Sequence, residues 1–367
     1  MVTWSPPMPR CAPVVTLAVL AAAGAAAPTG AAEPTTALSA YVEPYYSWDF
    51  DRPAGNERPP FIYNYDRVGE ATVNLALVRG AYASERLRAS VALAAGTYMD
   101  ANYAAESDTF RNVFEAQVGV RLSETRDLWL DAGVFPSHIG FESAIGRDNW
   151  TLTRSVAAEN SPYYEAGVKL GYRTADGKWF VSGLLLNGWQ RIRRPDGNTT
   201  PAFGWQLTWT PSSAVTVNSS GFVGNDFPDD ARRMRWFHNL YATFALDERW
   251  GLTLGLDTGA QQERKGSGRT DSWVSPQAIV RYKASDRLSL AGRIESYEDP
   301  DGVIVGPPGA GLRALGLSVN ADWVLHEAVV WRLEARQLES RDDAFASRGG
   351  RPKSGNFAVT TSLAVSF

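Results

Sequence analysis

Several residue types and patterns are scarce in this chain of 367 residues, and each scarcity excludes a class of protein. There is one cysteine, Cys11, which excludes a disulfide scaffold and a cysteine-based zinc site. The three histidines do not lie at a spacing that suits metal ligands. The formal net charge is only -4, so the basic surface that nucleic-acid binding requires is missing. After the N-terminal region no segment stays apolar for about 18 residues, which excludes a bundle of transmembrane helices.

Aromatic residues, in contrast, are plentiful: the chain has 13 Trp, 14 Tyr and 15 Phe. Apolar residues make up 44% and charged residues 21%, which is typical of a folded chain and not of a disordered one. The mean hydropathy is -0.24. These values leave a soluble all-β or mixed protein, or a membrane β-barrel, whose polar lumen also lowers the mean hydropathy.

The first 32 residues have the features of a cleaved signal peptide. Arg10 is followed by a small-residue apolar run from Ala12 to Ala27, and Gly30-Ala31-Ala32 offers the small side chains that a signal peptidase requires. An alternative interpretation is a buried, alanine-rich helix. Cleavage would leave residues 33–367 with 35 basic and 40 acidic residues, a net charge of -5, and no cysteine. The sequence therefore predicts an exported protein.

From Leu38 onward the dominant pattern is alternation with a period of two. In 164–172, for example, Tyr164, Val168 and Leu170 share one parity, whereas Glu165 and Lys169 share the other. A strand places each set on one face, whereas a helix would distribute both around its axis. The pattern predicts about sixteen strands near 38–49, 68–82, 86–98, 111–122, 127–135, 163–173, 178–190, 201–210, 214–224, 233–246, 250–260, 271–283, 287–297, 311–324, 328–338 and 355–367.

The connections between these strands alternate strictly between short and long. This order predicts an all-β fold, a transmembrane up-and-down antiparallel β-barrel with short periplasmic turns and longer outer loops. Side chains cannot fill so wide a barrel, so we expect the polar parity to face an aqueous lumen, where its charges stay solvated. The candidates for lining the lumen are Glu115, Arg121, Glu165, Lys169, Arg281, Arg293, Glu295, Arg332, Glu334 and Arg336.

Aromatic residues lie near the predicted strand ends, where amphipathic rings suit the two membrane interfaces. The expected girdle residues are Trp48, Trp179, Trp189, Trp209, Trp236, Trp250, Trp273, Trp323 and Phe367. Core aromatics are the alternative interpretation for any single residue. A final strand that ends in Phe367 resembles the signal by which bacterial outer-membrane proteins are presented to the barrel insertion machinery.

Residues 133–189 carry a resemblance to a known family. The segment Gly133 to Glu142 has the pattern G-x-F-x-x-x-I-G-x-E; Arg154-Ser155 follows it, and then Asn187-Gly188-Trp189. In these features the chain resembles the OmpL-like outer-membrane beta-barrel porin family, the "porin 2" group. The resemblance implies a channel in the outer membrane of a Gram-negative bacterium, and it supplies no substrate.

The connection 136–162 is the longest loop and the third outer one. In many porins this loop folds into the lumen and narrows it, so its charges of both signs become candidates for a transverse field across a constriction. A loop that caps the rim or packs on its neighbours is the alternative. Trp150 is expected to pack the loop against the barrel wall. The constriction candidates are His138, Glu142, Arg147, Asp148, Arg154 and Glu159.

No catalytic site, metal site or cofactor is predicted. The sequence contains no G-x-S-x-G nucleophile elbow, and His238, expected on the lipid-facing parity, lacks the Ser-Asn-Gly companions of a barrel lipase. The leading hypothesis is passive diffusion of small hydrophilic solutes through a weakly selective pore. A plugged barrel serving as an adhesin or structural protein, and less so a lipid-acting barrel enzyme, remain as alternatives. The expected partners are outer-membrane lipid, lipopolysaccharide, the insertion machinery and further copies of the chain in a homo-oligomer.

Overall fold

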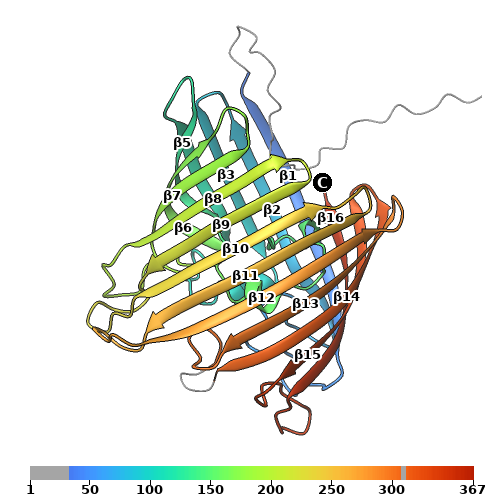
Figure 1. Ribbon diagram of the computed structural model, residues 1–367. Helices are drawn as coiled ribbons and strands as arrows, with labels where there is room; N and C mark the ends of the chain where they lie inside the picture. The colour runs from blue at the N-terminus through green and yellow to red at the C-terminus, as the bar shows by residue number, and fades with distance from the viewer. Residues whose placement is uncertain (1–32, 307–310) are drawn as a thin grey trace, which may run out of the picture.

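A computed structural model of the chain describes residues 33–306 and 311–367, and the predicted signal peptide, 1–32, lies outside the described residues. Sixteen antiparallel strands form a closed barrel (Figure 1). The first strand closes it by pairing with both the second and the last, with Tyr46 opposite Thr361. None of the described helices is long and apolar enough to cross a membrane. The predicted fold class is therefore confirmed.

Each predicted strand corresponds to one strand of the structure. The strands are β1 (Thr35–Asp49), β2 (Ala71–Ala83), β3 (Leu87–Ala95), β4 (Val113–Arg121), β5 (Asp127–Pro136), β6 (Tyr164–Arg173), β7 (Trp179–Leu186), β8 (Ala202–Ser212), β9 (Val215–Gly224), β10 (Arg235–Ala245), β11 (Trp250–Gln262), β12 (Thr270–Lys283), β13 (Leu288–Asp299), β14 (Leu312–His326), β15 (Val329–Ser340) and β16 (Gly355–Ser366). Three short helical segments lie in the outer loops: α1 (Thr97–Asn102), η1 (Gly146–Asp148) and α2 (Val156–Glu159).

Strand β3 ends earlier than the alternation predicts. Gly96 follows it with a φ of 130°, in the region that favours glycine, and a side chain there would collide with the backbone of Asn74. The chain then turns into α1 instead of extending the strand. Tyr98 and Met99 of α1 are buried, and the helix packs on β2 and β3.

The two faces of the wall differ as the alternation predicts. Along β14, for example, Leu315, Leu317 and Val319 are exposed, whereas Ser318 and Asn320 between them are buried toward the lumen. Exposed apolar residues on the outside of the barrel are the arrangement expected where lipid surrounds the protein.

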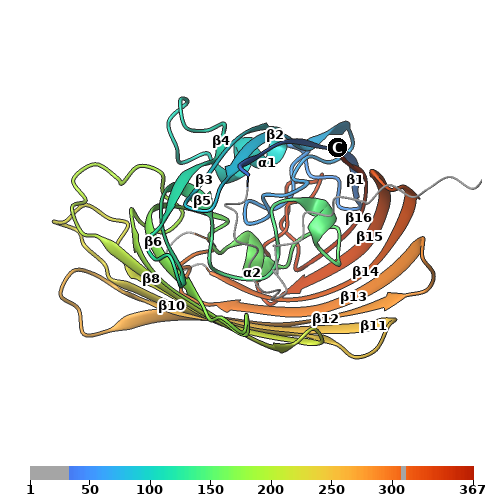
Figure 2. The same ribbon diagram turned by 90° about the horizontal axis from the view of Figure 1, so that it is seen from above.

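Outer loops fill much of the space inside the ring of strands, where α2 is visible in Figure 2. A hydrophobic cluster lies at the end of the lumen from which the outer loops emerge. Its wall residues include Phe222, Phe237 and Trp273, on which buried loop residues such as Phe61 and Val156 pack. The largest apolar cluster of this barrel therefore lies inside its mouth.

Candidate functional site: the lumen and its third loop

The loop between β5 and β6, residues 137–163 and here called L3, crosses the full height of the lumen. It leaves the wall at the long-loop rim, yet Arg147 Nη1 donates to the carbonyl of Ala328 (3.1 Å), and Arg147 also bonds the carbonyl of Glu327. Both acceptors lie in the short turn between β14 and β15. Just above this turn, Arg332 Nη2 donates to the carbonyl of Asn149 (2.8 Å). L3 is therefore fixed at both rims.

A buried ionic network attaches the middle of L3 to β13 and β15. Thr153 donates through its backbone N (2.6 Å) and its Oγ1 (2.7 Å) to the carboxylate of Glu334. Arg293 bonds Glu334 (3.1 Å) and the carbonyl of Thr153 (2.7 Å). Glu295 accepts from the backbone N of Val156 and from Arg336, both at 2.6 Å. Charges of the wall are thus paired with one another and with the backbone of L3, which makes their burial tolerable.

Arg154 holds L3 in its own shape. The guanidinium is fully buried and donates to three backbone carbonyls of the same loop, those of Ser143 (2.6 Å), Ala144 (2.9 Å) and Leu152 (2.6 Å). Next to it, Ser155 is the N-cap of α2 and accepts from the backbone N of Ala158 (3.1 Å). These contacts make the loop a compact unit that can dock as one body.

Glu159 connects L3 to the first outer loop, residues 50–70. Its Oε2 accepts from the backbone N atoms of Tyr63 (3.0 Å) and Asn64 (3.2 Å). Burial raises the pKa of Glu159 to about 7, and the hydrogen bond from Tyr63 and the charge of Arg154 only partly offset this effect. The contact between the two loops therefore contains a group that titrates near neutral pH.

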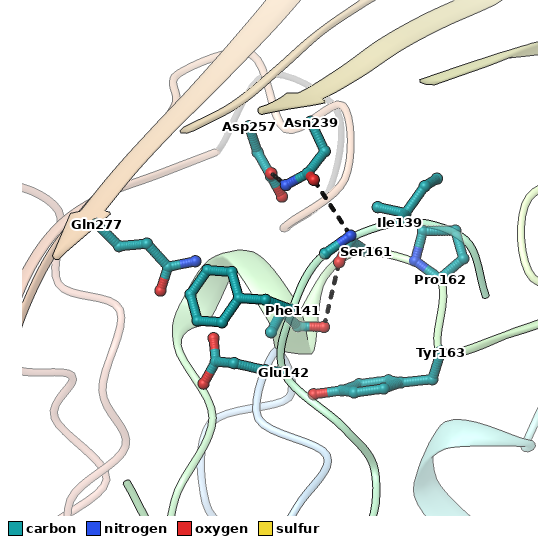
Figure 3. Close-up of a pocket in the computed structure, with 11 residues that line it drawn as sticks. Ile139, Phe141, Glu142, Ser161, Pro162, Tyr163, Asn239, Asp257 and Gln277 are labelled. Carbon is teal, nitrogen blue, oxygen red and sulfur yellow. Dashed lines mark hydrogen bonds between the residues drawn. The ribbon is translucent and has the colours of Figure 1, made fainter. Parts of the chain in front are cut away.

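On its other side L3 rests on glycines of β11. The ring of Trp150 lies over Gly251 and that of Phe141 over Gly255, so closely that a Cβ would come within 2.7 Å and 2.9 Å of the two rings. The expected packing of Trp150 on the wall is confirmed. Small polar cavities interrupt this interface, one of which lies between L3 and Gln277 of β12 (Figure 3). The contact with β10–β12 is therefore less ionic than that with β13–β15.

On the wall from β2 to β6, cations are more exposed than the acids with which they pair. Arg88 bonds Asp131 at 2.7 Å through both Nε and Nη2, across Gly119, where any side chain would obstruct the pair. The side chain of Arg88 is 45% exposed and that of Lys169 is 22% exposed, against 2% for Asp131. Arg79 pairs with Glu115 at 2.9 Å, and these two side chains are 15% and 7% exposed. Solvent in this part of the lumen therefore meets positive charge.

The six constriction candidates differ in their exposure to solvent. Asp148 is exposed and Arg147 is half-buried. Arg154, Glu159 and His138 are buried, and the side chain of Glu142 is only 2% exposed, so the expectation that these four face pore water was wrong. The physical reason is that the wall and the loops enclose each side chain and supply hydrogen-bond partners, for instance the carbonyl of Gly221 that bonds His138 Nε2 (2.9 Å). Among the described residues, His138 Nδ1 and Glu159 Oε1 have no such partner.

The ten lumen-lining candidates all lie on the inward parity, but they differ in exposure. Arg121, Lys169 and Arg281 keep access to solvent. The other seven are buried, and the expectation that their charges stay solvated was wrong: Glu115, Glu165, Arg293, Glu295, Arg332, Glu334 and Arg336. L3 covers Arg293, Glu295, Arg332 and Glu334, whereas wall residues enclose Glu115. The alternation identified the face of the wall and could not show which part of it a loop occupies.

Two of the expected girdle residues lie inside the barrel. Trp189 and Trp273 belong to the cluster in the mouth, with ring centroids 6.4 Å apart, and Trp273 faces Gly259 across the lumen side of β11 and β12. Their assignment to the girdle was wrong, because Trp273 has the lumen parity of β12 and Trp189 lies in the loop after β7, which packs into the mouth. The remaining candidates lie on the outward parity or at the chain end: Trp48, Trp179, Trp209, Trp236, Trp250, Trp323 and Phe367.

One polar pair on the outer face was not foreseen from the sequence. His238 of β10 lies near the exposed Trp236, and its Nε2 is 2.8 Å from Oγ of Ser219 on β9. The two residues lie on neighbouring strands and 19 positions apart in the sequence, so no local motif revealed them. Elsewhere in the described part of the chain, no three His, Cys, Asp or Glu side chains are grouped as metal ligands.

Sequence comparison assigns the barrel to a family. Residues 35–367, which include every strand, match the family described as "Putative beta-barrel porin-2, OmpL-like". The chain belongs to this family. The porin has no match among curated proteins.

Solved structures confirm the fold of the porin. The anion-selective porin from Comamonas acidovorans has a TM-score of 0.60 at 10% identity, over 91% of this chain and 100% of that one. The trimer form of OmpT from Vibrio cholerae has a TM-score of 0.57 at 10% identity, over 91% and 99%. The outer-membrane channel DcaP of Acinetobacter baumannii has a TM-score of 0.56 at 10% identity, over 91% and 97%. Family and fold together identify an outer-membrane porin.

Proposed function

We propose that this porin is a channel for small hydrophilic solutes that passes anions in preference to cations. The observation that supports the preference is a group of three cations that are more exposed than their counter-acids: the side chains of Arg88, Lys169 and Arg79 are 45%, 22% and 15% exposed, against 2% for Asp131 and 7% for Glu115. A wall lined by one sign of charge concentrates ions of the opposite sign and raises their rate of entry.

The acidic residues of the opposite wall do not cancel this effect. Glu295 and Glu334 are each 3% exposed or less, and their carboxylates are paired with Arg293 and Arg336 beneath L3. On L3 itself, the exposed Asp148 opposes the half-buried Arg147. We therefore expect a modest preference for anions and not an exclusive one, in agreement with the mixed charge of the sequence.

The hydrophobic cluster in the mouth lies at the outer end of the proposed path. Conduction can be tested by inserting the refolded mature protein into planar bilayers. Stepwise, stable, ohmic currents would support a channel. A barrel that is folded, as heat-modifiable gel migration would show, but carries no current would contradict the proposal and favour a plugged barrel with an adhesive or structural role.

We assign the Ser219–His238 pair no catalytic role. The residues beside Ser219 pair with β8 and β10, so their backbone N–H groups are used within the sheet. These groups are therefore not available to stabilise an oxyanion, as a serine hydrolase would require. Each member of the pair instead satisfies a polar atom of the other on a lipid-facing wall. We propose that the porin is not an enzyme, and labelling of Ser219 by a fluorophosphonate would contradict this. Assembly into a homo-oligomer is part of the same proposal and can be measured by native mass spectrometry in detergent.

A further inference from the structure

A second cavity in the lumen has a composition that points to a ligand. It measures about 240 Å³ and lies inside the rim of short turns, between L3 and strands β10–β12. Trp150 and Arg281 both line it. The Trp150 ring rests over Gly251, and Gly251 is the direct partner of Arg281 in the β11–β12 ladder. Trp150 and Arg281 therefore reach the same cavity, the indole from L3 and the arginine from β12.

Arg281 differs from the other arginines of the neighbouring wall. Arg293, Arg332 and Arg336 are buried and ion-paired, whereas Arg281 is half-buried and has no carboxylate within ion-pair distance in the described part of the chain. Its one side-chain hydrogen bond runs from Nη2 to Ser289 Oγ (3.2 Å). Most of its five N–H donors are therefore available to a ligand.

The other charged residues that line the cavity have partners of their own or offset one another. Lys283 is paired with Asp286 at 2.9 Å. Asp247 accepts from the backbone N atoms of Arg249 and Trp250, both at 2.7 Å. Glu248 and Arg249, adjacent in the same turn, contribute one charge of each sign. The cavity thus combines an arginine that has no ion-pair partner among the described residues with the indole of Trp150.

We propose that this cavity binds a small aromatic carboxylate, a solute with one planar ring and one carboxyl group. The forked guanidinium of Arg281 would receive the carboxylate through two parallel hydrogen bonds, and the ring would lie against Trp150. The volume is below the roughly 300 Å³ at which sites for drug-sized ligands begin, so it suits a single ring. This inference rests on the proposed anion-preferring channel and names a class of solute for it, held at the periplasmic end of the path.

The test measures binding and conduction separately. Isothermal titration of the refolded porin in detergent uses benzoate as the probe, and cyclohexanecarboxylate as a ligand of the same charge without a planar ring. We expect benzoate to bind more tightly than cyclohexanecarboxylate. Arg281→Gln should weaken the binding of benzoate by roughly tenfold or more, because it removes a charge-assisted bidentate contact. Trp150→Leu should reduce the difference between the two ligands.

The control variant is Arg287→Gln, which removes the same charge from an exposed position in the turn below β12, outside the cavity. It should bind benzoate like the wild type. Equal benzoate affinity in Arg281→Gln and wild type, or equal affinity of the wild type for both ligands, would overturn the site. The reversal potential of the wild type without benzoate tests the channel proposal, so the two can fail independently.

Discussion

The ionic attachment of L3 leads to a quantitative prediction for Arg293→Gln. Arg293 is fully buried and lies within ion-pair distance of Glu142 (3.7 Å), Glu295 (3.2 Å) and Glu334 (3.1 Å). Removing one member of a buried ion pair costs about 3–5 kcal/mol, because the partner is left uncompensated. The substitution leaves three carboxylates facing one another and also removes the bonds to Thr153. We therefore expect L3 to detach from the wall.

The detachment of L3 from the wall can be measured by limited proteolysis. A loss of about 3 kcal/mol in docking raises the population of detached L3 about a hundredfold. Cleavage of a transiently opened segment follows that population when opening and closing are fast. Trypsin should then cut after Arg147 and Arg154, both inside L3, about a hundred times faster than in the wild type.

A matched control is Arg313→Gln, which breaks an exposed pair with Asp342 (3.3 Å). Exposed pairs contribute about 0–1 kcal/mol, so L3 cleavage should change little. Heat-modifiable migration shows whether each variant is folded. Folded Arg293→Gln with wild-type cleavage kinetics would refute the idea that the ionic network holds L3.

Three further predictions concern L3. Gly251→Ala places a Cβ within 2.7 Å of the Trp150 ring, so it should displace the loop and raise conductance or current noise. The pKa of Glu159 in the folded protein, about 7, lies above its ordinary value. The contact between L3 and the first outer loop should therefore be fully stable below about pH 4.5 and weaken as the pH rises through 7. Proteolysis of the first loop at pH 5 and at pH 8 measures this change. Asp148→Asn should shift the reversal potential toward anions, whereas Glu142→Gln, whose side chain is buried, should affect L3 cleavage instead.

Each of these predictions has a defined control. Gly183→Ala adds a methyl group where nothing lies within 4 Å, so conductance should stay at the wild-type level. Glu159→Gln should remove the pH dependence of the loop contact, and a profile that persists would assign it to another group. A larger shift of the reversal potential in Glu142→Gln than in Asp148→Asn would contradict the burial of Glu142.

The barrel could be predicted because the patterns that specify it extend over short stretches of the sequence. A period of two assigns each residue to a face, as in Tyr164 and Glu165, and strictly alternating connection lengths imply that every strand reverses. Strand limits failed where backbone geometry intervened, as at Gly96.

The filling of the lumen could not be predicted in this way. Which wall charges L3 covers depends on contacts such as Thr153 with Glu334, 181 positions apart, for which the sequence contains no local signal. One signal was available and was misread: Phe222, Phe237 and Trp273 are aromatic residues on the polar parity near the long loops. Aromatic residues at such positions mark a mouth packed by loops and not a membrane girdle.

The anion preference of the porin can be measured as the reversal potential across a KCl gradient, for the wild type and for the double variant Arg88→Gln, Lys169→Gln. We expect a preference for chloride in the wild type that the double variant loses, because the variant removes the two cations that pair with the buried acid Asp131. A wild type that prefers potassium, or a double variant with unchanged chloride preference, would contradict this expectation.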